Sequence, residues 1–177
     1  NGPAAMSISS APRFQTTSQA PRAISAAGGE FFLPQNGFAP FEIAQMLQRG
    51  EINAISAVPT LWRILLQNAD LFGPERRAVK WIEIGSQLMT GDEKRALRNL
   101  FPDATIVQHY GLTEASRTTF LRVDEAEDSA LDSVGKAIAP VEVKADLSGR
   151  IMIRGPHVAR FELTENGPRP LTNADGW

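Results

Sequence analysis

The chain has 177 residues, of which 42% are hydrophobic, so it is long enough for one domain with its own core or for part of a larger one. Its net charge of -2 gives no basic field for nucleic acid, and no apolar run approaches the roughly 20 residues that a membrane-spanning helix needs. The chain contains no cysteine and does not open with a signal-peptide pattern. We therefore expect a cytoplasmic globular protein whose partner is a small molecule.

Strand and helix patterns alternate along the first two thirds of the chain. The predicted strands are 31–33, 52–58, 79–84 and 105–107, and the predicted helices are 40–49, 61–68 and 90–99. This alternation predicts an α/β fold in which helices flank a parallel sheet. Ligands of such folds bind at the carboxyl ends of the strands, two of which are Gly85 and Tyr110.

The helix at 90–99 has the clearest start signal. Thr90 and Glu93 have the spacing of a capping box, in which the hydroxyl and the carboxylate satisfy free amides of the first turn. The helical period predicts that Ala96, Leu97 and Leu100 face the core.

The chain divides into three predicted regions. Residues 1–27 are rich in Ser, Thr, Gln, Pro and Ala and are expected to be an irregular or partly ordered lead-in. Residues 28–123 form the α/β region. Residues 124–177 are expected to form a smaller, β-rich antiparallel region with strands between 134 and 154 and no closing element after Thr164. The acidic run 124–128 is expected to be a solvated loop.

The densest group of chemically useful side chains follows the strand at 105–107. Gly111 can adopt a positive φ and let a ligand approach the backbone, while Tyr110 offers a flat face on which a base can stack. Thr113 offers a hydroxyl donor and Glu114 a hard oxygen ligand that suits Mg²⁺. These residue types suit a nucleotide phosphate with its metal. The alternative interpretation is an ordinary strand-to-turn junction with a surface glutamate.

The motif Tyr-Gly-x-Thr-Glu at 110–114 resembles the central motif of the adenylate-forming superfamily, which includes acyl- and aryl-CoA ligases, luciferases and peptide-synthetase adenylation domains. Further resemblances occur in family order: 57–60 to "VPT", 84–88 to "GGAPL", 134–137 to "VGKP", 149–158 to "GEL-x-IRGPxV" and 175–177 to "DGW". They span about 28–177. The resemblance therefore implies a central part of the large N-terminal domain of such an enzyme.

The chain also departs from the family pattern. It contains no phosphate loop of the "TSGTTGxPKG" type, no "TGD" motif and no carboxy-terminal domain with a catalytic lysine. Gln87 replaces a small residue, and Arg150 replaces the acidic residue of "GEL". We therefore expect the isolated chain to be catalytically inactive.

The resemblance also implies residue roles. The adenine edge would contact Gly85, Ser86 and Gln87, and the acyl-adenylate would be walled by Gln108, His109, Tyr110, Gly111, Leu112 and Thr113. Thr113 and Glu114 are the candidate catalytic residues, with Glu114 as the metal ligand, and Arg117 and Thr118 are the candidate substrate pocket. The alternatives are a surface position for Arg117 and, for His109, a histidine satisfied by neighbouring polar groups.

The implied activity is that of an ATP- and Mg²⁺-dependent ligase that activates a fatty or aromatic carboxylic acid as acyl-AMP and transfers it to CoA. One alternative is an adenylation enzyme that loads a carrier protein. Another is a catalytically inactive nucleotide-binding or structural α/β fragment. An unrelated doubly wound nucleotide-binding domain is disfavoured because no glycine fingerprint follows the first strand.

Overall fold

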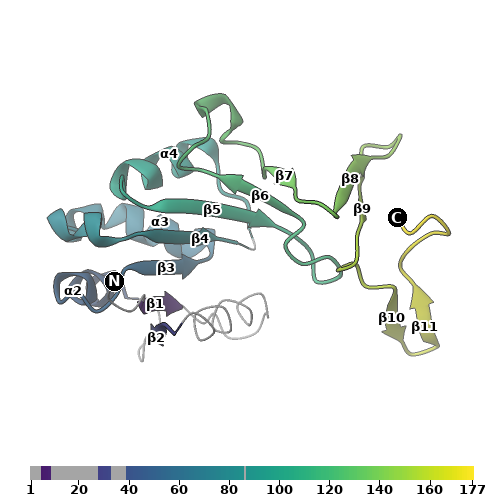
Figure 1. The fold of residues 1–177 in the computed structure, drawn as a ribbon, viewed down its shortest axis with the longest axis horizontal. Helices are drawn as coiled ribbons and strands as arrows, with labels where there is room; N and C mark the ends of the chain where they lie inside the picture. Colours follow the sequence, from purple (N-terminus) through teal and green to yellow (C-terminus); the bar gives the residue numbers. More distant parts are fainter. Residues whose placement is uncertain (1–4, 9–27, 33–38, 86) are drawn as a thin grey trace.

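A mixed sheet forms the centre of the molecule (Figure 1). The computed structural model describes residues 5–8, 28–32, 39–85 and 87–177. The seven strands of the sheet lie in the order β2-β1-β3-β4-β5-β6-β7. Their bounds are β1 Ala5–Ile8, β2 Glu30–Phe32, β3 Ala54–Ala57, β4 Trp81–Ile84, β5 Thr105–Tyr110, β6 Thr119–Arg122 and β7 Lys136–Ala137. Strands β1 to β5 are parallel, whereas β6 and β7 are antiparallel to their neighbours. The predicted parallel sheet is confirmed.

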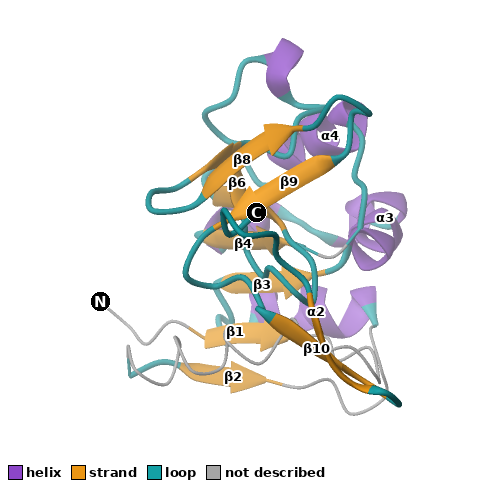
Figure 2. Cartoon of the chain, turned by 90° about the vertical axis from the view of Figure 1, so that its right-hand side faces the viewer, coloured by secondary structure: helices purple, strands orange, loops and turns teal. Residues whose placement is uncertain are grey.

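The α-helices lie along one face of this sheet, as Figure 2 shows. Their bounds are α2 Pro40–Gln48, α3 Pro59–Gln67 and α4 Gly91–Leu100. Helices α2 and α3 both begin at a proline, whose fixed φ suits the first helical position and whose missing amide costs nothing there. Helix α3 therefore starts earlier than the apolar pattern from Leu61 predicts.

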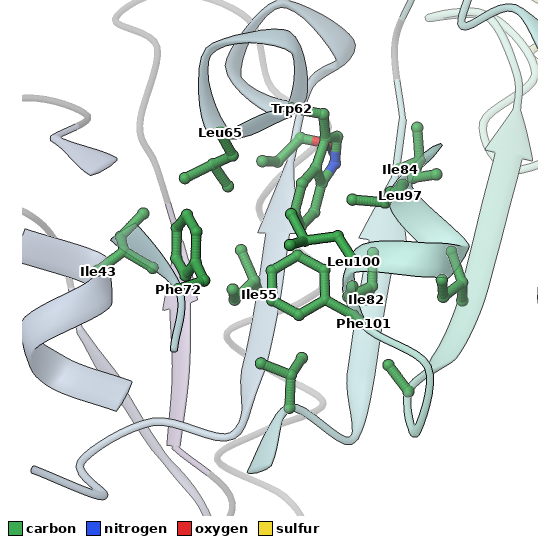
Figure 3. Close-up of a cluster of buried hydrophobic side chains, with 14 of the residues drawn as sticks. Ile43, Ile55, Trp62, Leu65, Phe72, Ile82, Ile84, Leu97, Leu100 and Phe101 are labelled. Atoms are coloured by element: carbon green, nitrogen blue, oxygen red, sulfur yellow. Dashed lines mark hydrogen bonds between the residues drawn. The ribbon is translucent and has the colours of Figure 1, made fainter. Parts of the chain in front are cut away.

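The core lies between the helices and the sheet (Figure 3). Trp62 of α3 and Phe101 after α4 meet edge to face at a centroid distance of 6.5 Å, and Phe72 meets Phe101 at 5.7 Å. The indole Nε1 of Trp62 donates to the carbonyl of Ala57 over 3.0 Å. The aromatic contacts hold α3 against the segment that follows α4, and the indole hydrogen bond holds α3 to the end of β3.

Helix α4 confirms the predicted capping box but corrects the predicted inner face. Thr90 and Glu93 exchange both capping hydrogen bonds. Leu97 and Leu100 are buried as expected, whereas Ala96 is exposed and Lys94 is fully buried. The Nζ of Lys94 donates to the carbonyls of Leu131 and Ser133. The inward face therefore follows a spacing of three residues, and the lysine is tolerated there because backbone carbonyls satisfy its ammonium group.

The acidic run 124–128 is bound to the fold and is not merely a solvated loop. Asp124 accepts a hydrogen bond from the amide of Ile106 over 3.0 Å, at the start of β5. Asp128 pairs with Arg95 and Arg98 of α4. The run thus connects the start of β5 to helix α4.

The remaining strands form two small antiparallel sheets. Strand β8 (Glu142–Ala145) pairs with β9 (Ile151–Arg154), and β10 (Phe161–Thr164) pairs with β11 (Gly167–Pro170). The expected separate region from 134 onward is corrected in part, because β7 belongs to the main sheet. The β10–β11 hairpin contradicts the expected absence of a closing element. The sequence does not indicate this hairpin because β11 contains Pro168 and Pro170, and proline is depleted in strands.

Within the part of the chain that the structure describes, no helix is long and apolar enough to cross a membrane.

Candidate functional site

Two neighbouring strand ends bring the predicted site residues together. Strands β4 and β5 are parallel neighbours in which Ile84 pairs with Gln108, so Gly85 lies beside His109 where both strands end. In Figure 1 these ends point toward the side of the molecule that holds β8 to β11. The predicted ligand edge of the sheet is therefore occupied by residues from both predicted motifs.

A tight turn over Gly111–Thr118, called the 111–118 turn below, joins β5 to β6. Leu112 and Ala115 exchange backbone hydrogen bonds of 3.0 and 3.2 Å, and the amide of Thr118 donates to the carbonyl of Tyr110 over 2.7 Å. The side chains of Leu112, Thr113 and Glu114 are exposed on this turn. The amide of Ala159 donates to the Glu114 carbonyl over 2.7 Å and ties the turn to the segment before β10.

The reason for glycine at 111 differs from the expectation. Gly111 does not have a positive φ. A Cβ at this position would lie 2.4 Å from the amide nitrogen of Arg117 and 2.8 Å from the carbonyl oxygen of Ala115. The close approach that requires glycine is therefore made by the turn itself.

A buried carboxylate that belongs to none of the predicted motifs lies beneath this turn. Glu83 on β4 is 8% exposed. It accepts a 2.5 Å hydrogen bond from Nη2 of Arg117 and a 3.0 Å hydrogen bond from Oγ of Ser56 on β3. Nδ1 of His109 lies 3.3 Å from the same carboxylate, within ion-pair distance, although the geometry falls short of a hydrogen bond. We call these four residues the Glu83 cluster.

The electrostatics of the Glu83 cluster favour an ionised carboxylate. Burial by itself opposes ionisation and raises the pKa of Glu83, but the contacts with His109, Arg117 and Ser56 outweigh burial and hold that pKa below its ordinary value of 4.5. The charge of Arg117 is thus balanced inside the protein by Glu83. Alternation along β4 places Glu83 on the face opposite Ile82 and Ile84, which is the only sequence signal that points to it.

The other predicted residues occupy different environments. Gln108 is 2% exposed, and its Oε1 has no hydrogen-bond partner among the described residues. Thr118 is buried and donates to the carbonyl of Ala115, and its hydroxyl also lies 3.2 Å from Nε2 of His157. Gln87 is exposed and accepts from Thr60 over 2.8 Å. Ser86 lies outside the described residues.

The turn suits a magnesium ion that is held mainly by a substrate. No group of three His, Cys, Asp or Glu side chains in the described ranges could hold a metal by itself. Magnesium bound to nucleotides typically takes one or two carboxylates and completes its shell with phosphates and water. The exposed carboxylate of Glu114, beside the exposed hydroxyl of Thr113, fits that donor set.

The family model described as AMP-binding enzyme matches residues 11–161 of this chain. The chain belongs to this family. The match includes both strand ends and the entire 111–118 turn, and it confirms the resemblance to adenylate-forming enzymes.

Individual relatives agree with this assignment. The 2-succinylbenzoate–CoA ligase of Listeria monocytogenes is 31% identical over 140 residues, which cover 77% of this chain and 28% of the ligase. The 4-coumarate–CoA ligase-like 6 of Oryza sativa is 24% identical over 187 residues, covering 99% of this chain and 31% of that protein. The chain thus spans about a third of the length of these relatives.

The fold matches a solved member of the family. The O-succinylbenzoate coenzyme A synthetase of Bacillus subtilis, in complex with ATP and magnesium ion, has a TM-score of 0.67 and 22% identity to this chain. The match covers 98% of this chain and 40% of the synthetase. The architecture described above is therefore that of a part of the large N-terminal domain of adenylate-forming enzymes.

Proposed function

We propose that this chain is the part of an AMP-forming acid ligase that holds the nucleotide, its Mg²⁺ and the acid during adenylation. The observation that carries the proposal is the 111–118 turn, which presents Thr113 and Glu114 at the carboxyl ends of β4 and β5. Such ends are where open α/β sheets bind their ligands. The family match adds the reaction class.

In the proposed reaction, a carboxylate oxygen of the acid attacks the α-phosphorus of ATP. The bond to the bridging oxygen of pyrophosphate breaks, so that acyl-AMP and pyrophosphate form. Negative charge builds on the phosphate oxygens in the transition state. The hydroxyl of Thr113 donates a hydrogen bond to one of those oxygens, and the carboxylate of Glu114 binds Mg²⁺. Bound Mg²⁺ supplies Lewis-acid stabilisation of phosphate charge.

The remaining candidates keep narrower roles in the proposal. Tyr110 is half-buried at the end of β5, where its ring can stack on adenine, and Gly85 and Gln87 follow β4 beside it. Buried Gln108 has an unpaired Oε1 that a ligand donor would satisfy. The buried hydroxyl of Thr118 donates its hydrogen bond to the carbonyl of Ala115. Thr118 therefore contributes to the shape of the substrate site and not a hydrogen bond to the substrate.

We propose an aromatic or fatty acid as the substrate and CoA as the acceptor of the activated acyl group. The support is the nature of two relatives, which are a 2-succinylbenzoate–CoA ligase and a 4-coumarate–CoA ligase-like protein. The first name is that of a CoA ligase of an aromatic acid, and the second is that of a protein similar to one. A carrier protein is the alternative acceptor.

Exchange of labelled pyrophosphate into ATP tests the proposal in the complete gene product. A panel of aromatic and aliphatic acids is offered with Mg²⁺, and the same reactions are run with a chelator. We expect acid-dependent exchange that the chelator abolishes. If no acid on the panel supports exchange and ATP protects the protein from thermal unfolding, the nucleotide-binding alternative holds and the ligase proposal fails. Product analysis with CoA then identifies the acceptor.

A further inference from the structure

Glu83 is the most heavily paired carboxylate near the candidate site, and the proposed reaction gives it no role. We propose that Glu83 is a positioning residue that fixes the 111–118 turn on the sheet, so that Thr113 and Glu114 are held where the nucleotide phosphates bind. The consequence for activity rests on the proposed function. The structural claim, that Glu83 orders the turn, does not.

Several elements of the fold meet at the side chain of Glu83. Through Ser56, His109 and Arg117, the carboxylate of Glu83 connects β3, β5 and the 111–118 turn to its own strand β4. The side chain is almost completely buried. A buried carboxylate that keeps its charge must be paired and hydrogen-bonded, and removing it leaves its cationic partner uncompensated. The contact between Glu83 and Arg117 is therefore a structural constraint and not a surface ion pair.

Arg117 has an unusual backbone conformation. Its φ of 55° is left-handed, and among the described residues it is the only non-glycine residue with a positive φ. Side chains other than Asn and Asp rarely adopt this conformation without an outside constraint. The contact of the guanidinium group with Glu83 supplies that constraint, because it holds the side chain of this residue against β4.

Arg117 lies near one end of the turn, and Gly111 lies at the other. The amide nitrogen of Arg117 is the atom that a Cβ at Gly111 would strike, so the two ends of the turn pack directly on each other. The following amide, of Thr118, closes the turn on the carbonyl of Tyr110. Thr113 and Glu114 lie between these ends with exposed side chains. Their placement consequently depends on the ends of the turn, which Glu83 anchors through Arg117.

The same contacts change the expected role of Arg117. Because Glu83 already balances its charge, Arg117 is not a free cation for the carboxylate of the acid substrate. Its contribution to a substrate pocket is therefore the shape of the wall that it forms.

Amide hydrogen exchange in the complete gene product tests the structural claim without any activity. The reporting amides are those of Leu112, Ala115 and Thr118, all hydrogen-bonded within the turn. In Glu83→Gln we expect these amides to exchange about tenfold faster or more, as the loss of one charge-assisted hydrogen bond permits. The amide of Lys94 in α4 should keep its wild-type rate. Unchanged exchange at all three turn amides would overturn the proposal.

The matched control is Glu51→Gln. Glu51 accepts two hydrogen bonds from Arg49, of 2.7 and 2.8 Å, but both side chains are exposed after α2, away from the turn. This variant makes the same chemical change and should alter neither turn exchange nor activity. If Glu51→Gln accelerates exchange in the turn as much as Glu83→Gln does, the effect is global and the positioning role is refuted.

A second variant covers the case in which Glu83→Gln fails to fold. Arg117→Met keeps a long side chain at the left-handed position but removes the guanidinium group. We expect the same local acceleration of exchange in the turn. Wild-type protection in Arg117→Met would show that the contact with Glu83 is not needed, and would overturn the proposal.

Kinetics separate this proposal from the proposed function. In Glu83→Gln we expect kcat for adenylation to fall about tenfold and the Mg²⁺ concentration for half-maximal rate to rise, with little change in KM for the acid. Full wild-type kinetics in Glu83→Gln would refute the positioning of Thr113 and Glu114. A wild-type protein that exchanges no pyrophosphate would instead refute the proposed function, and the hydrogen-exchange result would still decide whether Glu83 orders the turn.

Discussion

The imidazole of His109 lies in the space that a side chain at residue 85 would need. A Cβ at Gly85 would be 2.4 Å from Cε1 and 2.6 Å from Nε2 of that ring. The ring is 8% exposed and its Nδ1 faces Glu83, so it has little room to move. Packing against His109 therefore explains the glycine, whereas its contact with adenine remains a prediction.

Substitution of this glycine tests the packing. We expect Gly85→Ala to lower the free energy of unfolding by about 1–3 kcal/mol, the usual cost of overfilling a packed site. His109→Ala should remove most of that penalty when the two changes are combined, since it deletes the ring that is struck. Urea denaturation of the two single variants and the double variant measures this coupling. Strictly additive changes would show that the two residues do not collide.

The lowered pKa of Glu83 predicts a pH-dependent contribution to stability. This contribution is complete above the ordinary pKa of 4.5 and is lost as the pH falls through the lower pKa of the folded state. Glu83→Gln should therefore be about 1–3 kcal/mol less stable than wild type at neutral pH, and the difference should shrink in acid below pH 4.5. Denaturation at several pH values checks this. A difference that grows in acid would contradict the assigned charge state.

The sequence predicts part of the site for clear reasons. Thr113 and Glu114 of the turn follow Tyr110 within four residues of sequence, and the placement of Gly85 beside His109 follows from neighbouring strand ends. Glu83 could not be predicted, because its partners are 27 and 34 residues away and only the sheet register brings them together. The positive φ expected at 111 occurs at Arg117, since sequence gives no measure of how tightly a turn packs on itself.

At the scale of single elements, local signals identified the helices well. Proline at the first position and the capping box act within one turn of a helix, so they can be read from neighbouring residues. Strand β1 was not predicted because its pairing partners β2 and β3 are distant in the sequence. The β10–β11 hairpin was not predicted because β11 contains prolines, which are depleted in strands. Burial of Lys94 is not predictable from its own helix, since the carbonyls that satisfy its ammonium group come from residues 131 and 133.

The capping box of α4 provides an element-scale prediction. Thr90→Ala removes the hydroxyl that accepts from the Glu93 amide and should lower the free energy of unfolding by about 1 kcal/mol. Thr90→Ser retains the hydroxyl and should stay close to wild type. Chemical denaturation compares the two variants. An equal loss in both would show that the methyl group, and not the cap, stabilises the helix start.

At the scale of the whole molecule, the helices cover one face of the sheet while the strand ends meet the β8–β11 side (Figures 1 and 2). Backbone and side-chain contacts from 157 and 159 reach the 111–118 turn from that side. The candidate site is therefore held both by the main sheet and by the segment that precedes β10. A substitution in the turn should act on adenylation without unfolding the molecule, because its exposed side chains belong to no core.

Thr113→Val is the first of two variants that test this. The change removes the hydroxyl that is proposed to donate a hydrogen bond to a phosphate oxygen, but it keeps the shape of an exposed side chain. We expect kcat of the complete gene product to fall by about 10²-fold or more, as for loss of a transition-state donor, with a near-normal melting temperature. Unchanged kcat would remove Thr113 from the catalytic candidates.

The most direct test of the central claim is pyrophosphate exchange by Glu114→Gln in the complete gene product, measured over a range of Mg²⁺ together with the melting temperature. The change keeps the shape of the side chain but replaces a charged oxygen ligand by a neutral amide. If Glu114 holds Mg²⁺, we expect a large fall in pyrophosphate exchange, a higher Mg²⁺ requirement, near-normal ATP binding and an unchanged melting temperature. A variant that melts early while its folded fraction keeps full specific activity would make Glu114 a structural carboxylate and contradict the metal role.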